Sequence, residues 1–182
     1  MDSLSDSALM LKVKSGESHT LGLLYERYKK RLFGFFFQMS KDASLCEDLV
    51  QNVFIRVIKY KHTYTEESNF VSWIFKIARN VYYDHFKGKN KSKTYDIEEQ
   101  YDVHSFENAE NSIEQTERIL LLKKAINQLP KAKREIIILS KMKELKYKEL
   151  GEIIGCSEGN ARIKVHRALH DLKKIYLTLE ER

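Results

Sequence analysis

The sequence predicts an all-α protein of two small helical domains joined by a flexible acidic linker, the second of them a helix-turn-helix domain. Three observations carry this prediction. Apolar residues recur at helical spacing along most of the chain. Only seven glycines and one proline interrupt 182 residues, which is too few for a turn-rich β fold. Acidic residues collect in one strip between two basic segments, and hydrophobic residues, at 42%, suffice for packed cores.

The N-terminal domain is predicted to span residues 1–91 and to hold three helices. The first carries apolar residues at helical spacing from Leu21 to Phe36, and the polar segment 40–44 interrupts the pattern. The second helix has its apolar side at Leu45, Leu49, Val53, Val57 and Tyr60. Residues 61–69 are polar and lack a period, so they form a loop. Ser68 or Asn69 then caps a third helix, whose apolar stripe is Phe70, Trp73, Ile74, Ile77, Ala78 and Val81.

A change of charge marks the linker, predicted at residues 92–115. Residues 91–115 hold two Lys/Arg against seven Asp/Glu, with few aliphatic side chains. Residues 1–90 hold fourteen basic against ten acidic residues, and residues 116–182 hold sixteen against nine. Two basic domains on an acidic linker are typical of a protein with two nucleic-acid-facing modules, although basic helices can also be merely soluble.

The C-terminal domain, residues 116–182, is predicted to begin with a helix that turns Ile119, Leu122 and Ile126 inward. Pro130 stops or redirects the chain. Residues 131–143 then form another helix, around Ile136, Ile137 and Leu139.

Residues 147–172 have the pattern of a helix-turn-helix. Leu150, Ile153 and Ile154 give a short first helix its apolar face, Gly155 and Cys156 make the turn, and Ser157 caps the second helix. The buried face of the second helix is predicted at Ala161, Val165, Ala168 and Leu172. The opposite, outward face is predicted at Ile163, His166, Arg167 and His170, with Arg162 and Lys164 on its flanks. A helix that offers Arg, Lys and His outward suits the DNA major groove, whereas the alternative is an ordinary helical hairpin.

The third helix of the N-terminal domain mixes aromatic and basic side chains. Lys76 and Lys87 alternate with Tyr82, Tyr83 and Phe86, a combination that can stack on unpaired bases and hold the backbone of single-stranded DNA. Phe70 and Trp73 belong to the core in this interpretation. Tyr82 is expected to be open to interaction.

The two cysteines, Cys46 and Cys156, match no metal-ligand spacing and are expected to be buried free thiols in a reducing compartment. No cofactor is expected. The N-terminal residues lack the basic and apolar regions of a signal peptide, and no stretch reaches the ~18–20 apolar residues that cross a bilayer. A cytoplasmic protein without membrane insertion is therefore expected.

Several motifs together resemble a known family. Residues 21–31, EDLVQNVFIRV at 47–57, and FVSWIFKIARN at 70–80 followed by Asp84 resemble the promoter-melting domain of bacterial sigma factors. LPKAKR at 129–134 and SEGNARIKVHRAL at 157–169 resemble their upstream-element domain. Two such domains on a short linker are similar to the extracytoplasmic-function (ECF) group of the sigma-70 superfamily. The resemblance implies a transcription initiation factor that binds RNA polymerase core and promoter DNA, and often a cognate anti-sigma factor.

The resemblance also implies site residues. The surface for the polymerase clamp helices corresponds to Asp48, Leu49, Gln51 and Asn52, although many members carry glutamate where this chain has Asn52. The loop 64–69, with Tyr64, Ser68 and Asn69, corresponds to the segment that captures a flipped base of the -10 element, and Asn80 to a contact with the opening DNA. The aromatic-basic helix adds Lys76, Tyr83 and Lys87 to this -10 set. The -35 positions are Arg162, Ile163, His166 and Arg167, and Lys164 is added to this set. The helical wheel also turns Ile163, His166 and Arg167 outward and places Arg162 and Lys164 on the flanks. By family analogy, the linker acids Asp96, Glu98, Glu99 and Asp102 mimic nucleic acid in the RNA exit path.

Two other functions are weighed against this one. A stand-alone helix-turn-helix repressor or activator would be a dimer that binds palindromic DNA without polymerase. A DNA recombinase would need an activated Ser or Tyr beside clustered arginines, whereas the first domain spreads Arg27, Arg31, Arg56 and Arg79 over separate helices. An enzyme is therefore not expected.

Overall fold

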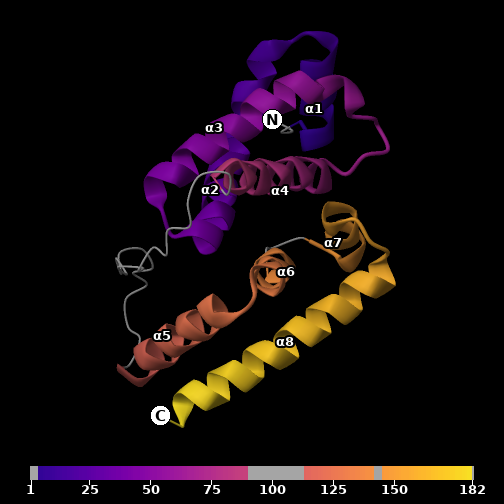
Figure 1. Cartoon of the computed structure of the whole chain (residues 1–182). Coiled ribbons are helices and arrows are strands. Elements are labelled where there is room, and N and C mark those ends of the chain that lie inside the picture. The colour runs from indigo at the N-terminus through magenta and orange to yellow at the C-terminus, as the bar shows by residue number, and fades with distance from the viewer. Residues whose placement is uncertain (1–3, 90–112, 142–144, 182) are drawn as a thin grey trace.

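The computed structural model describes residues 4–89, 113–141 and 145–181, and all regular structure in these ranges is helical (Figure 1). The N-terminal half contains α1 (Asp6–Ser15), α2 (Leu21–Ser40), α3 (Ala43–Tyr60) and α4 (Phe70–Lys89), with short 3₁₀ turns at Ser18–Thr20 and Lys61–Thr63. The C-terminal half contains α5 (Ile113–Gln128), α6 (Lys131–Lys141), α7 (Tyr147–Ile154) and α8 (Glu158–Glu180). The all-α prediction is confirmed.

The sequence pattern did not predict helix α1, because a clear helical spacing of apolar residues begins only at Leu21. Ser5 caps the helix by accepting a hydrogen bond from the Ala8 amide at 3.2 Å, and Gly16 ends it at φ 114°. Its buried residues are Leu9, Met10 and Val13. They are few and lie among serines and lysines, so the apolar period is short and weak.

Helices α2, α3 and α4 build the N-terminal core. The break before α3 is confirmed: Lys41 takes a left-handed conformation and Asp42 caps α3 through the Leu45 amide at 2.9 Å. Aromatic rings join the helices, with the Phe35 and Phe75 centroids 5.9 Å apart. Tyr82 belongs to this core, since it is buried and its hydroxyl donates to the Met39 carbonyl at 3.1 Å. The expectation that Tyr82 is open to interaction was therefore wrong.

Helix α5 faces α8 with a different stripe from the one predicted. Ala125 and Leu129 are buried, whereas Ile119 and Leu122 are exposed and Ile126 is half-buried. Residues 119–122 are four consecutive apolar residues, so their spacing alone did not determine which of them face inward. The helix also begins at Ile113, a little before the predicted end of the linker, and residues 90–112, with all four linker acids, lie outside the described residues.

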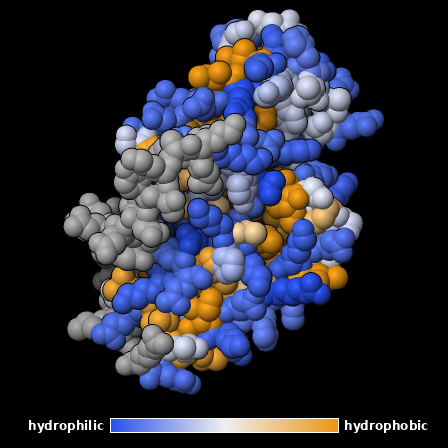
Figure 2. All heavy atoms as spheres, in the orientation of Figure 1, coloured by the Kyte–Doolittle hydropathy of each residue, from blue (hydrophilic) through white to orange (hydrophobic). Residues whose placement is uncertain are grey.

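The two halves lie against each other. Helix α4 packs on α7 and α2 packs on α6, and α4 lies above α6 and α7 in Figure 1. On the face drawn in Figure 2, hydrophobic side chains gather in separate patches within a mainly hydrophilic surface. The arrangement places the two predicted DNA-binding segments within one compact body.

Candidate nucleic-acid interface

The turn between α7 and α8 has the geometry that its sequence predicts. Gly155 ends α7 at φ 74°, and Ser157 Oγ accepts a hydrogen bond from the Asn160 amide at 3.3 Å. Helix α7 and the turn touch so closely that a Cβ on Gly151 would lie 2.6 Å from the Cys156 carbonyl oxygen. The start of α8 is therefore held at a fixed angle to α7.

The buried and outward faces of α8 are as the helical wheel predicts. Ala161, Val165, Ala168 and Leu172 are buried. The five predicted -35 residues are all exposed: Arg162, Ile163, Lys164, His166 and Arg167. The Arg162 guanidinium lies over the Tyr147 ring, 5.3 Å from its centroid. This face presents cations and one exposed isoleucine to solvent, a composition suited to phosphates and base edges.

Helix α6 supports α8 from behind. Lys133 forms an ion pair with Asp171, and this contact lowers the pKa of the Asp171 carboxyl. The buried side of α6 includes Ile136, Ile137 and Leu139. The packing of α8 against α6 and α7 thus holds the exposed face of α8 in place.

Four of the predicted -10 residues share one side of α4. Lys76, Asn80, Tyr83 and Lys87 follow one another at steps of four, three and four residues. Lys76, Asn80 and Lys87 are exposed, and Tyr83 is half-buried. Its hydroxyl donates to Glu135 Oε2 at 3.0 Å, and burial, together with that carboxylate, raises its pKa to about 12. The side is basic and polar, with one aromatic ring at the edge of the C-terminal domain.

In the loop before α4, one predicted -10 residue is not accessible to DNA. Tyr64 is fully buried against Phe70 and Trp73, and its hydroxyl donates to the Ser68 carbonyl oxygen at 3.0 Å. Its side chain supports the loop from inside and does not face solvent, because a ring among several aromatic neighbours buries more apolar area than it would outside.

The other two residues of the loop remain accessible. Ser68 Oγ lies 2.8 Å from Thr65 Oγ1 and is half-buried. Asn69 is exposed and caps α4, accepting a hydrogen bond from the Ser72 amide at 3.0 Å. Its Nδ2 also donates to Glu149 Oε1 on α7 at 2.9 Å.

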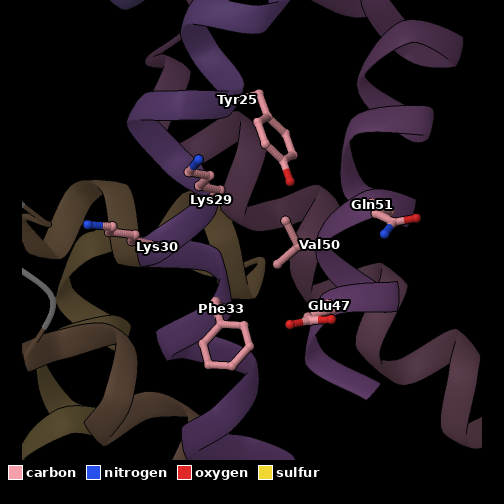
Figure 3. A pocket seen from close by; sticks show the side chains of 7 residues that line it. All are labelled: Tyr25, Lys29, Lys30, Phe33, Glu47, Val50 and Gln51. Carbon is pink, nitrogen blue, oxygen red and sulfur yellow. The ribbon is translucent and has the colours of Figure 1, made fainter. Parts of the chain in front are cut away.

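Helix α3 carries the predicted polymerase-docking residues. Asp48, Gln51 and Asn52 are exposed, whereas Leu49 is buried at 1% exposure and is a core residue. A cavity of about 370 Å³ lies beside this face, between α2 and α3 (Figure 3). It is lined by Tyr25, Lys29, Lys30 and Phe33 from α2, and by Glu47, Val50 and Gln51 from α3.

Comparison with known proteins decides between the candidate functions. Residues 24–92 match the family Sigma-70 region 2, and residues 119–172 match Sigma-70, region 4. The chain is 34% identical over 158 residues to the ECF RNA polymerase sigma factor SigM of Bacillus subtilis (strain 168), covering 86% of this chain and 95% of that protein. The chain belongs to the ECF sigma factor family. It is also 29% identical to the RNA polymerase sigma factor CarQ of Myxococcus xanthus, covering 94% of this chain and 97% of that protein.

Solved structures agree with this family. The chain aligns with the sigma factor RpoE of Bartonella quintana, solved with the anti-sigma factor NepR, at a TM-score of 0.66 and 26% identity, over 84% of this chain and 92% of that one. CnrH, solved with the cytosolic domain of CnrY, aligns at a TM-score of 0.69 over 93% and 96% of the two chains, and its 18% identity shows the fold alone.

As an ECF sigma factor, the protein is a promoter-specific transcription initiation factor that binds RNA polymerase core and promoter DNA. A stand-alone repressor or activator is not favoured, because region 2 matches as well as the helix-turn-helix region. Among the described residues, no helix combines the length and apolar character needed to cross a bilayer. The same residues contain no cluster of His, Cys, Asp and Glu side chains that could hold a metal ion.

Sequence reasoning missed several side chains around these faces of the ECF sigma factor. Ile55 and Ile58 are 62% and 51% exposed on α3, next to the predicted docking residues. The sequence pattern could have indicated both isoleucines, since they fall outside the apolar stripe that is buried on α3. Arg79 and Glu135, which meet between the two halves, gave no comparable signal, because they lie far apart in sequence.

Proposed function

We propose that α8 of this sigma factor enters the major groove of the -35 element through Arg162, Ile163, Lys164, His166 and Arg167. Arginine pairs with guanine edges, and lysine holds phosphates without reading sequence. The exposed position of all five side chains on a capped, well-supported helix is the observation that carries this proposal.

The -10 element is assigned to the N-terminal domain. Lys76, Asn80, Tyr83 and Lys87 follow the DNA strand along α4, and Ser68 and Asn69 receive an extruded base beside them. Extruding a base costs a few kcal/mol. Stacking and hydrogen bonding on the protein, worth about 1–3 kcal/mol per base for stacking, offset that cost and stabilise the open duplex.

Polymerase core is assigned to the exposed side of α3, with Asp48, Gln51 and Asn52 as its polar contacts. Ile55 adds an exposed apolar side chain to the same side. Docking through a rigid helix leaves both DNA-binding domains available to the promoter.

The proposed mechanism is physical, without a catalytic step by this chain, and takes place in the cytoplasm beside RNA polymerase. An anti-sigma factor is the proposed regulatory partner, because the RpoE relative was solved with one. Such a partner would control how much of the protein reaches polymerase.

Single-round transcription with bacterial core polymerase on a library of genomic fragments tests the assignment. New start sites that share -10 and -35 motifs are expected only when the protein is present. Arg167→Ala should reduce them through the -35 contact and Asp48→Ala through core docking, whereas Lys173→Ala, an exposed position later on α8, serves as the control. No new transcripts, with a footprint on duplex DNA by the protein alone, would instead identify a conventional repressor or activator.

A further inference from the structure

Three polar contacts tie the N-terminal half to the C-terminal half. Arg79 Nε lies 2.9 Å from Glu135 Oε1, and the Tyr83 hydroxyl donates to the other oxygen of the same carboxylate at 3.0 Å. Asn69 Nδ2 donates to Glu149 Oε1 at 2.9 Å. The first of these contacts is an ion pair and the other two are hydrogen bonds. Arg79, Tyr83 and Asn69 belong to α4 or to its cap, and the two glutamates belong to α6 and α7. These five residues are called the latch below.

Glu135 is the centre of the latch. It is only 2% exposed, although it is a carboxylate, and burial raises its pKa while Arg79 and Tyr83 oppose that effect. A buried carboxylate is stable only when its oxygens have partners. Here Oε1 is paired with the charge of Arg79 without an aligned hydrogen bond, and Oε2 accepts the hydrogen bond of Tyr83, so both partners come from the other half of the molecule. The site is therefore built for the closed arrangement rather than for the C-terminal domain alone.

The latch also occupies part of the DNA-binding surface. Asn69 and Tyr83 belong to the proposed -10 residues, and both are hydrogen-bonded to the C-terminal domain. Lys76, Asn80 and Lys87 on the same helix stay exposed. In the closed form the two lysines and Asn80 thus stay in solvent, whereas the Tyr83 hydroxyl and the Asn69 amide are hydrogen-bonded to the C-terminal domain.

We propose that the latch holds the free chain closed and withholds Asn69 and Tyr83 from DNA until the two domains separate. The functional half of this statement rests on the proposed function, which assigns these two residues to the -10 element. The conformational half stands on the contacts themselves. Separation of the domains returns Glu135 to water and frees the Asn69 amide and the Tyr83 hydroxyl at the same time, so opening and release of these two groups are one event.

Small-angle X-ray scattering of the full chain tests closure through charge reversal. Arg79→Glu and Glu135→Arg each place like charges in the buried pair, and the double variant restores opposite charges. The wild type should have a radius of gyration near the ~16 Å of a compact chain of this length. Each single variant should expand clearly, and the double variant should return toward the wild-type value.

The matched control is Arg56→Glu, which disrupts an ion pair of 2.6 Å with Asp84 that lies wholly inside the N-terminal domain. It should leave the radius of gyration unchanged. Circular dichroism of each variant confirms that the helices are intact. If Glu135→Arg unfolds its domain, Arg79→Glu remains informative, because that side chain is 31% exposed and outside the core. Folded single variants that stay as compact as the wild type would overturn the latch.

Transcription separates the two proposals. Glu135→Arg in complex with polymerase core should start transcription as the wild type does, because Glu135 is not among the proposed polymerase or promoter contacts and the latch acts only on the closed chain. A wild-type chain that starts no transcription would refute the proposed function, while the scattering data would still decide on the latch. We expect scattering to show a compact wild type and expanded single variants, and we expect transcription to start normally with Glu135→Arg.

Discussion

The Arg162 guanidinium lies 5.3 Å from the centroid of the Tyr147 ring, so the helix before the turn orients a cation on the helix that follows it. This contact links α7 directly to the proposed -35 face. Its geometry reduces the freedom of a long side chain before DNA arrives.

Replacing Tyr147 should therefore weaken promoter binding, even though Tyr147 is not itself one of the proposed DNA contacts. Tyr147→Leu removes a cation–π contact worth about 0.5–1 kcal/mol at an exposed site, and a loss of about two- to fivefold in affinity is expected. The measurement is competition for a -35 duplex by the polymerase-bound protein. Tyr147→Phe keeps the ring and should bind as the wild type; equal losses in the two variants would contradict this role.

Lys164 and Arg167 should differ in their response to salt and sequence. Lys164→Ala is expected to weaken all promoters alike and to lower the slope of log affinity against log salt by about one. Arg167→Ala should cost about 1–3 kcal/mol and relax the preference at one base pair. Titrations at several salt concentrations on promoter variants would show both effects. An unchanged slope for Lys164→Ala would exclude the phosphate contact.

Gly151 should tolerate no side chain. A Cβ there would meet the Cys156 carbonyl oxygen at 2.6 Å, and that oxygen belongs to the backbone of the helix-turn-helix, so it cannot easily move away. Gly151→Ala is expected to destabilise the C-terminal domain by about 1–3 kcal/mol, measured by urea unfolding. Gly159→Ala is the control, since a Cβ at Gly159 meets nothing within 4 Å and should stabilise α8 by up to about 1 kcal/mol. Similar unfolding midpoints for the two variants would refute the close approach.

Tyr64 should behave as a structural residue. Tyr64→Phe loses the hydroxyl contacts with Ser7 and Ser68, at a cost of about 1 kcal/mol. Tyr64→Ala should cost about 3–5 kcal/mol, because the buried ring is lost as well. Thermal unfolding measures both. A Tyr64→Ala variant of normal stability that fails only in promoter opening would restore the role that the family resemblance implied.

The two cysteines should differ in reactivity. Burial raises the pKa of the Cys46 thiol to about 11, so at pH 8 only about one molecule in a thousand carries the thiolate. Cys156 is half-buried at the turn. Iodoacetamide should label Cys156 in the native protein and Cys46 only after unfolding, as peptide mass spectrometry would show. Equal labelling of both in the native state would indicate that the α2–α3 core opens readily.

The sequence predicted best where one helix has one buried stripe. The exposed position of the five proposed -35 residues followed from the period of the buried residues Ala161, Val165 and Ala168. Tyr64 was misplaced because a single aromatic residue in a polar loop has no period. The contact of Tyr83 with Glu135 spans 52 residues, and pairing at that separation leaves no local pattern. The buried face of a helix with one clear apolar stripe, such as α8, was thus predictable, whereas the face of α5 and the packing of the two domains were not.

Helix α1 determines how this protein can be shortened. Lys14 Nζ donates to the Tyr64 carbonyl oxygen at 2.6 Å, and the Ser7 hydroxyl is hydrogen-bonded to the Tyr64 hydroxyl oxygen at 3.0 Å. The region 2 match begins only at residue 24. A fragment trimmed to that boundary would retain every proposed contact residue but lose the two hydrogen bonds that support the loop proposed to receive a base. Promoter opening by such a fragment would suffer even though no DNA contact had been deleted.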